Sequence, residues 1–199
     1  MKLKLSIPSK TFIIGEYLAM SGGPALIACT EPCFELILSD TVFSEPKITG
    51  INAESPAGQF LNKFNSDFSC FDLEFKDPHK TRGGLGASSA QFALLLALYC
   101  AIKRSRRFEI SPELISAVTA FEAKDGFPYL PTYRDCAWNG LGMPPSGADV
   151  IAQLVGRMSY VHAEHNVVHS FNWDFPNIEF ALARTGQKTA THEHLKSIV

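Results

Sequence analysis

The sequence predicts a mixed fold of β-strands and α-helices around one sizeable core. Residues 1–7 and 71–75 alternate polar and apolar side chains, which is the pattern of a strand with one buried face. Residues 91–101 are rich in Ala and Leu and are typical of a buried helix. Residues 114–121 repeat apolar side chains at helical spacing. A chain of 199 residues suffices for one such core, or for one domain and part of another.

Composition excludes several classes of function. Apolar residues make up 46% of the chain and the formal net charge is −2, as in ordinary soluble globular proteins. No basic excess favours nucleic-acid binding, the N-terminus lacks the apolar segment of a signal peptide, and no apolar run is long enough for a membrane span. The five cysteines are an odd number without a CxxC pair, so we expect reduced thiols. We therefore expect a cytoplasmic protein that binds neither nucleic acid nor membrane.

Turn and cap signals predict the remaining elements in chain order. Residues 7–18 form a short β-rich apolar run that a plain hairpin would explain, although a glycine and a glutamate directly after it suggest a site. Ser55-Pro56 and Ser111-Pro112 each provide a cap and a first helical residue, and the second helix is expected to end near Gly126. Further strands are expected at residues 25–29, 34–39, 157–161, 167–171 and 178–182, and a further helix after residue 147. Residues 126–145 show no period and are expected to form a long binding loop or lid.

The segment from Gly83 to Ala90 carries the strongest chemical signal. Its glycines run directly into the predicted helix, whose first turn offers unpaired N–H groups and the positive end of the helix dipole. Such a loop is typical of a phosphate site, although a glycine-rich turn before an ordinary core helix is the alternative. Lys80 and Arg82 stand beside the loop, either as phosphate ligands or as ordinary surface charges.

Three segments resemble motifs of the GHMP kinases, the family of galactokinase, homoserine kinase, mevalonate kinase and phosphomevalonate kinase. Gly-Leu-Gly-Ala-Ser-Ser-Ala at residues 84–90 resembles their phosphate loop, with Lys80 in place of a leading proline and Ala87 in place of a serine. Residues 8–17 resemble the first motif, and their Gly-Glu-Tyr ending is similar to that of phosphomevalonate kinases. Pro-Ser-Gly-Ala-Asp at residues 145–149 is close to a motif of mevalonate kinases.

The resemblance implies a fold and a division into domains. The fold would be an α+β domain resembling ribosomal protein S5 domain 2, with helices packed on a mixed β-sheet. Residues 1–175 would form the N-terminal, ATP-binding domain, and residues 176–199 the first elements of a C-terminal domain. The family's third, glycine-rich motif belongs to that second domain and is absent from this sequence.

The resemblance also assigns roles to individual residues, with ATP and Mg²⁺ as cofactors. Asp149 would take the proton of the attacking hydroxyl and Lys10 would stabilise the developing anion. Ser88 and Glu122 would hold the magnesium ion. The phosphates would lie on Gly83, Gly84, Leu85, Gly86, Ala87, Ser88 and Ser89, and the substrate on Glu16, Tyr17, Ser146 and Gly147.

Plainer interpretations stay open for several of these residues. Asp149 could be an ordinary acid in the first turn of a helix, where the dipole favours negative charge. Glu122 could face solvent. His162, His165 and His169 are close in sequence but lack the partners that a zinc site needs, so surface histidines are favoured.

The implied activity is ATP-dependent phosphorylation of a small hydroxylated metabolite, with mevalonate or phosphomevalonate favoured. The alternatives are a non-catalytic nucleotide-binding module and one half of a split GHMP enzyme. We expect a homodimer, or a partner chain that supplies the missing lobe, because the strand at residues 178–182 would otherwise leave apolar surface uncovered.

Overall fold

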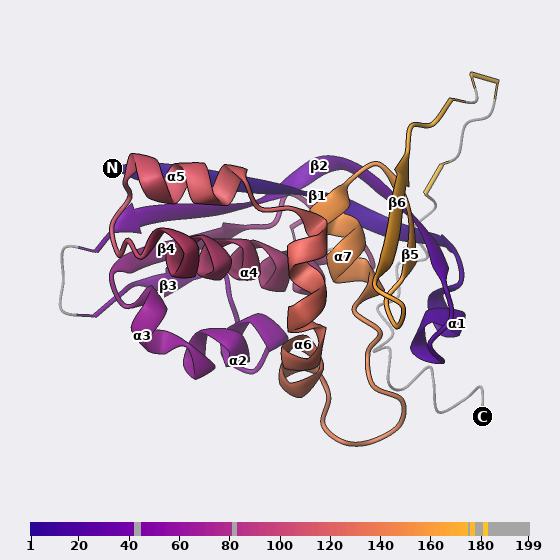
Figure 1. Ribbon diagram of the computed structural model, residues 1–199, viewed down its shortest axis with the longest axis horizontal. Helices are drawn as coiled ribbons and strands as arrows, with labels where there is room; N and C mark the ends of the chain where they lie inside the picture. Colours follow the sequence, from indigo (N-terminus) through magenta and orange to yellow (C-terminus); the bar gives the residue numbers. More distant parts are fainter. Residues whose placement is uncertain (42–44, 81–82, 175, 178–180, 183–199) are drawn as a thin grey trace.

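The computed structural model describes residues 1–41, 45–80, 83–174, 176–177 and 181–182 of the chain (Figure 1). The elements are, in chain order, β1 (Lys2–Ile14), α1 (Glu16–Met20), β2 (Ala25–Asp40), β3 (Ile48–Thr49), α2 (Pro56–Lys63), α3 (Asn65–Phe68), β4 (Phe71–Lys76), α4 (Ala87–Ser105), α5 (Pro112–Thr119), the 3-10 helix η1 (Ala123–Tyr129), α6 (Leu130–Ala137), α7 (Ala148–Val155), β5 (Met158–His162) and β6 (Val167–Phe171). Within the described ranges, no helix is both long and apolar enough to cross a bilayer.

A six-stranded sheet is built around the long strand β2. β1 pairs antiparallel with β2 from Lys2↔Ser39 to Ile14↔Leu26. On its other side, β2 pairs with β4 through residues 35–40 and with β5 through residues 25–28, both antiparallel. β3 pairs parallel with β4, so the sheet is mixed, as predicted.

The sequence predicted two strands where the structure has the single strand β2. The ladder between β1 and β2 runs from Ile7↔Phe34 to Ser9↔Thr30, with a register shift between these two pairs. Such an irregularity accommodates extra residues and bends the strand without ending it. Residues 30–33, between the two predicted strands, therefore form an irregularity inside β2 and not a strand end.

The core lies between one face of the sheet and the helices. Phe34, Leu36 and Leu38 alternate along β2 and are fully buried, which matches the two-residue period of a strand. Helix α4 packs against them and contributes buried side chains along almost its whole length. Phe60 of α2 lies between Phe92 and Tyr99 of α4, with ring centroids 5.0 Å and 5.5 Å away. Full burial of one such side chain stabilises the fold by about 1.5–3 kcal/mol.

Residues 120–137 differ most from the sequence prediction. Helix α5 ends at Thr119, well before Gly126, and the expected lid or loop is partly helical, as η1 and α6. A capping box explains the break, because the backbone N–H of Glu122 donates to Asp125 at 3.0 Å and the Glu122 side chain accepts in return. The prolines that suggested irregular chain are accommodated, since one stands in the first turn of α6.

Other predicted elements are confirmed. Ser55 and Ser111 cap α2 and α5, and α4, α7, β4, β5 and β6 form where the patterns placed them. The predicted strand at residues 178–182 and the predicted domain boundary at residue 175 fall largely outside the described residues.

Candidate active site

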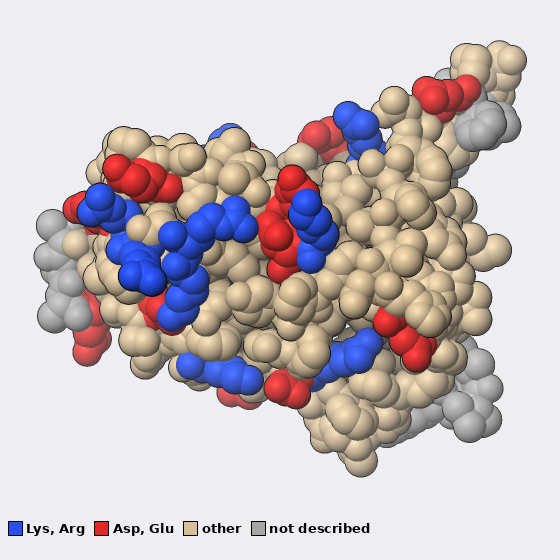
Figure 2. Space-filling view, viewed as in Figure 1, with Lys and Arg blue, Asp and Glu red and all other residues tan. Residues whose placement is uncertain are grey.

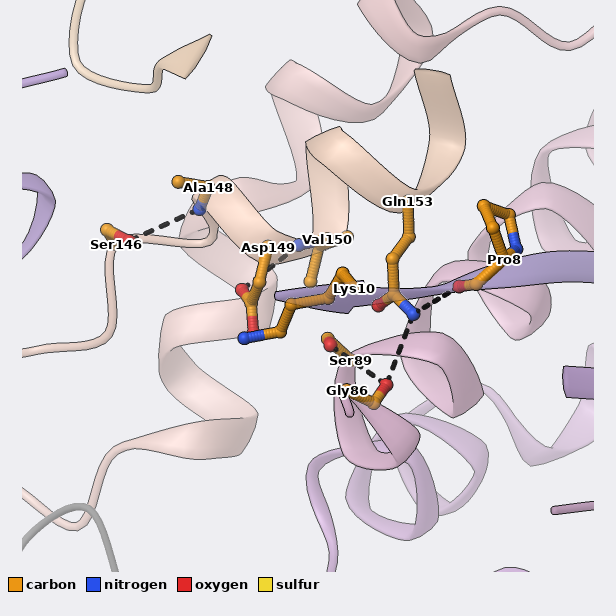
Figure 3. A network of polar contacts seen from close by, with 9 residues as sticks. All are labelled: Pro8, Lys10, Gly86, Ser89, Ser146, Ala148, Asp149, Val150 and Gln153. Carbon is orange, nitrogen blue, oxygen red and sulfur yellow. Dashed lines mark hydrogen bonds and ion pairs between the residues drawn. The ribbon is translucent and has the colours of Figure 1, made fainter. Parts of the chain in front are cut away.

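Strand β1 and helices α4 and α7 meet at Lys10 (Figure 3). The backbone N–H of Lys10 donates to the carbonyl of Leu85 at 3.0 Å, which ties β1 to the glycine loop. Gln153 of α7 donates from Nε2 to the carbonyl of Pro8 at 2.8 Å and to that of Gly86 at 3.3 Å. The three GHMP-like segments are far apart in sequence, and these bonds hold them together.

Gly86 caps α4 in the left-handed conformation, at φ 86°. A Cβ at this position would lie 2.7 Å from Cγ of Lys10, so only glycine fits between the loop and β1. The amides of Ala87, Ser88 and Ser89 have no acceptor within the described part of the chain. Ser89 is buried and donates from Oγ to the carbonyl of Gly86 at 3.1 Å, whereas Ser88 is exposed. This end of α4 therefore presents free donors and a positive dipole, which suit an anion.

Asp149 and Lys10 form an ion pair at the start of α7, with Oδ2 and Nζ 3.9 Å apart. Their side chains are only 24% and 12% exposed. Oδ1 of Asp149 accepts from the backbone N–H of Val150 at 3.0 Å, so Oδ2 is the oxygen directed at Lys10 (Figure 3). The Lys10 ammonium also lies 4.3 Å from the centroid of the Phe12 ring. A carboxylate beside an ammonium, at the edge of an anion site, can accept a proton while the ammonium stabilises the resulting oxyanion.

Ser146 and Gly147 form the turn that leads into α7. Gly147 is the N-terminal cap of α7, and the Ser146 hydroxyl accepts from the backbone N–H of Ala148 at 3.2 Å. Both residues adjoin Asp149, as the motif predicted. Their role in binding a substrate stays a prediction.

Tyr133 of α6 is a neighbour of Asp149 that sequence reasoning missed. Burial, together with the negative charge of Asp149, raises the pKa of Tyr133 well above its ordinary value, so the phenol stays neutral. Its ring packs edge-on against Phe92, with centroids 4.8 Å apart. Sequence offered no signal for this residue, because α6 itself was expected to be loop.

Gln153 is a second missed residue. It is 1% exposed, and its Oε1 has no hydrogen-bond partner among the described residues. A buried polar group without a partner is unusual and marks this junction as a polar centre. Its signal was readable, since a glutamine interrupts the apolar spacing of Ile151, Leu154 and Val155 on α7.

The structure separates the predicted magnesium ligands Ser88 and Glu122. Glu122 adjoins Asp125, whose carboxylate accepts from Arg104 in the last turn of α4 at 3.3 Å. Arg104 is 16 residues beyond Ser88. That spacing corresponds to about 24 Å of helix. Glu122 is 64% exposed and pairs with Lys124 at 2.7 Å. The sequence analysis placed Glu122 on α5, whereas α5 ends at Thr119 and the capping box starts a new segment at Glu122.

The other predicted residues lie further from this network. Glu16 and Tyr17 are exposed on α1, directly after β1, and are not part of the contacts in Figure 3. Gly83 and Gly84 are exposed on the loop before α4. Lys80 is exposed before that loop, while Arg82 lies outside the described residues.

No metal centre takes the place of the predicted one in the described ranges. His162 and His165 stack with ring centroids 4.3 Å apart, but no group of three or more His, Cys, Asp or Glu side chains gathers there as a metal site would require. On the face shown in Figure 2, Lys and Arg side chains stand beside Asp and Glu side chains, and the region over β5 and β6 carries few charges. Charge on this face is therefore mixed.

Comparison with known proteins identifies the fold. The scan against protein-family models gave no match, and neither did the search of curated proteins. Among solved structures, Lactococcus lactis galactokinase complexed with galactose is similar at a TM-score of 0.55 and 13% identity, covering 92% of this chain and 53% of that one. Streptococcus pyogenes mevalonate pyrophosphate decarboxylase is similar at a TM-score of 0.55 and 12% identity, covering 87% and 52%. Methanococcus jannaschii mevalonate kinase is similar at a TM-score of 0.51 and 13% identity, covering 86% and 56%.

The chain thus spans about half the length of the solved structures that it matches. At these identities the likeness concerns the arrangement of helices and strands. The described residues therefore have the fold of GHMP kinase family members, as the three motifs predicted.

Proposed function

We propose that this chain is the nucleotide-binding part of an ATP-dependent kinase that phosphorylates a hydroxyl group of a small metabolite. The observation that carries the proposal is the Lys10–Asp149 pair beside the glycine-capped end of α4. Phosphoryl transfer requires mainly positioning and neutralisation of charge, and this arrangement provides a cation, a base and open backbone donors. The fold and the order of the three motifs support the same activity.

Each group has a distinct role in the proposed reaction. Bound ATP would supply the phosphoryl group, and the free amides of residues 87–89 would hold its phosphates. Asp149 Oδ2 would accept the proton of the acceptor hydroxyl as its oxygen bonds to the γ-phosphorus and the bond to the bridging oxygen breaks. Lys10 would stabilise the negative charge that develops on the oxygen of the acceptor hydroxyl.

The two residues expected to bind magnesium do not lie together at this site. Ser88 lies where a ligand to phosphate-bound magnesium could stand, but Glu122 lies at the opposite end of α4. No step is therefore assigned to a divalent ion. The proposed chemistry rests on the protein's own amides, carboxylate and ammonium.

We further propose mevalonate or phosphomevalonate as the acceptor. The Pro-Ser-Gly-Ala-Asp segment supports the first, and the Gly-Glu-Tyr segment supports the second. A galactokinase matches the fold at least as well as a mevalonate kinase does, so sequence motifs alone carry this choice.

A second candidate is a non-catalytic nucleotide-binding module or one half of a split enzyme. One observation favours it: Glu122 lies too far from Ser88 to share a metal ion with it. In that case a second copy or a partner chain would complete the site. Exposed apolar side chains support such a partner, including Phe171 and Trp173, which line an open apolar cavity of 340 Å³ with Met158.

One experiment separates these candidates. The purified chain is titrated with ATP and magnesium while its melting temperature is recorded, and phosphoryl transfer to mevalonate, phosphomevalonate, homoserine and galactose is followed. We expect a nucleotide-dependent rise in Tm by ligand linkage, with transfer to one acceptor. Binding without transfer would favour the second candidate. No shift at millimolar ATP would contradict both.

The partner has its own measurement. Light scattering across a wide concentration range should show a dimer or larger species. A strictly monomeric chain at every concentration would count against self-association, leaving a separate partner chain to be sought.

A further inference from the structure

A cavity of 280 Å³ opens beside Ser146, in the segment that leads to Asp149. Four segments form its walls: the end of α1 with the turn at residues 19–22, Arg134 of α6, the segment at residues 144–146, and the β5–β6 turn at residues 163–164. Ser146 precedes Asp149 by three residues, a span of at most about 11 Å even in extended chain. The cavity wall at Ser146 is therefore close to Asp149 in space as well as in sequence.

Arg134 is held in the wall of the cavity. Its Nε donates to the backbone carbonyl of Pro145 at 3.2 Å. Helix α6 is fixed against the start of α7, because the Leu130 and Tyr133 side chains pack where any side chain at Gly147 would have to go. The guanidinium is thus positioned by one of its N–H groups, and within the described part of the chain its remaining donors have no acceptor.

Arg134 differs from Arg104 and Arg107 in its burial and in its charge partners. Arg104 and Arg107 are exposed and pair with Asp125 and Glu113. Arg134 is half-buried, yet no carboxylate of the described residues lies within ion-pair distance of it. Glu164 lines the same cavity, but its carboxylate packs against Gly22. A partly desolvated guanidinium with no counter-charge among the described residues favours an anionic ligand, and its planar fork matches a carboxylate or a phosphate.

We propose that Arg134 determines substrate specificity by binding the carboxylate or phosphate of the acceptor while the acceptor hydroxyl lies at Asp149. This inference rests on the proposed kinase function. It restricts the substrate class to small hydroxylated anions and makes neutral sugars unfavourable acceptors. The cavity is at the small end of ligand sites, which suits a compound of a few carbon atoms.

Binding without nucleotide tests the inference independently of catalysis. Calorimetry compares mevalonate, phosphomevalonate and the neutral triol obtained by reducing the mevalonate carboxylate to an alcohol. We expect the better-bound anion to bind at least about tenfold more tightly than the triol, since hydrogen bonds to charged groups are the stronger ones. Whichever of the two anions binds better distinguishes a carboxylate from a phosphate as the bound group.

Variants locate the effect at Arg134. Arg134→Gln should weaken binding of that anion by about 10- to 100-fold and leave binding of the triol unchanged, because glutamine removes the charge and keeps an N–H donor. The affinity of Arg134→Lys for the anion should lie between those of the wild type and Arg134→Gln, since lysine keeps the charge and loses the bidentate geometry. Arg107→Gln is the matched control and should bind like the wild type. The ATP-dependent rise in Tm should survive in Arg134→Gln, which shows that the variant is folded.

The inference is overturned if the anions and the triol bind equally, if none binds at millimolar concentration, or if Arg134→Gln binds the anion as the wild type does. A protein that responds to ATP but shows no preference for anions would leave the kinase function standing and remove only the role of Arg134. Selective anion binding that depends on Arg134, in a protein that does not respond to ATP, would support the specificity site and contradict the kinase.

Discussion

Helices α2 and α5 begin with serine followed by proline, whereas α4 and α7 begin with glycine. The Ser55 hydroxyl accepts from Gly58 N–H at 3.1 Å, and the Ser111 hydroxyl accepts from Leu114 N–H at 3.2 Å. Gly86 has no side chain to do the same for α4. Side chains therefore close the ends of the scaffold helices, while the end of α4 at the site keeps its donors open.

Helix α7 combines features of the serine-capped helices and of α4. Gly147 provides no side chain, but Ser146 and Asp149 accept from the first-turn amides of Ala148 and Val150. Its positive end is thus largely occupied by groups that also face the site. We infer that the start of α4 is suited to bind an external anion, and that the start of α7 is suited to hold a reactive carboxylate in place.

The largest expected effect comes from comparing the first-turn acids of α7 and α5. Asp149→Asn should lower turnover by about 100- to 10,000-fold, because an amide of the same size cannot accept the hydroxyl proton. Glu113→Gln on α5 should leave turnover unchanged. Steady-state kinetics with the active acceptor measures both, and the ATP-dependent Tm shift checks that Asp149→Asn still binds nucleotide. Turnover within twofold of the wild type would remove Asp149 from the mechanism.

A second comparison concerns two glycines of one loop. Gly86→Ala should destabilise the protein by about 3 kcal/mol, from the left-handed backbone and the overlap with Lys10. Gly84→Ala has the same kind of backbone, at φ 94°, but open space around it. It should cost only about 1 kcal/mol. Urea unfolding measures both, and equal losses would show that contact with Lys10 is not what requires glycine at residue 86.

Removing the serine caps should have a smaller effect, and only on stability. Ser55→Ala and Ser111→Ala should each lower the free energy of unfolding by about 1 kcal/mol, because each leaves one helix N–H without its acceptor. The Tm shift produced by ATP should be the same as in the wild type. A variant that lost nucleotide binding would refute the separation between scaffold caps and the site.

The smallest effect is a pH dependence at the capped end of α5. Hydrogen bonds from its own backbone N–H and from Ser111, with Arg107 nearby, lower the pKa of Glu113 below 4.5. A carboxyl whose pKa is lower in the folded state stabilises the fold at pH values above 4.5, and that contribution disappears as the pH falls through the folded-state pKa. The stability of the wild type should therefore fall more between pH 7 and pH 3 than that of Glu113→Gln. Urea unfolding at each pH measures both stabilities. Equal losses of stability in the wild type and in Glu113→Gln would contradict this prediction.

Local signals in the sequence predicted much of the scaffold. Ser-Pro caps, alternating strands and the run of Ala and Leu in α4 are decided within a few residues, so they could be read directly. The motifs also identified Lys10, Gly86 and Asp149 as candidate site residues. The spacing of these motifs along the chain does not say how far apart the residues lie in space. The ion pair of Lys10 with Asp149 at 3.9 Å, and the hydrogen bonds from Gln153 to Pro8 and Gly86, depend on the packing of α4 and α7 against β1.

By itself the sequence determined the class of fold, the caps and the identity of the loop, because each depends on neighbouring residues. The packing of the whole chain was needed to place Glu122 at the far end of α4, Tyr133 near Asp149 and Arg134 in the wall of the neighbouring cavity, the last two on a helix where a loop was expected. The physical reason is that helix α5 ends at Thr119 and a capping box at Glu122 starts a new segment, which no periodic pattern in the sequence indicated.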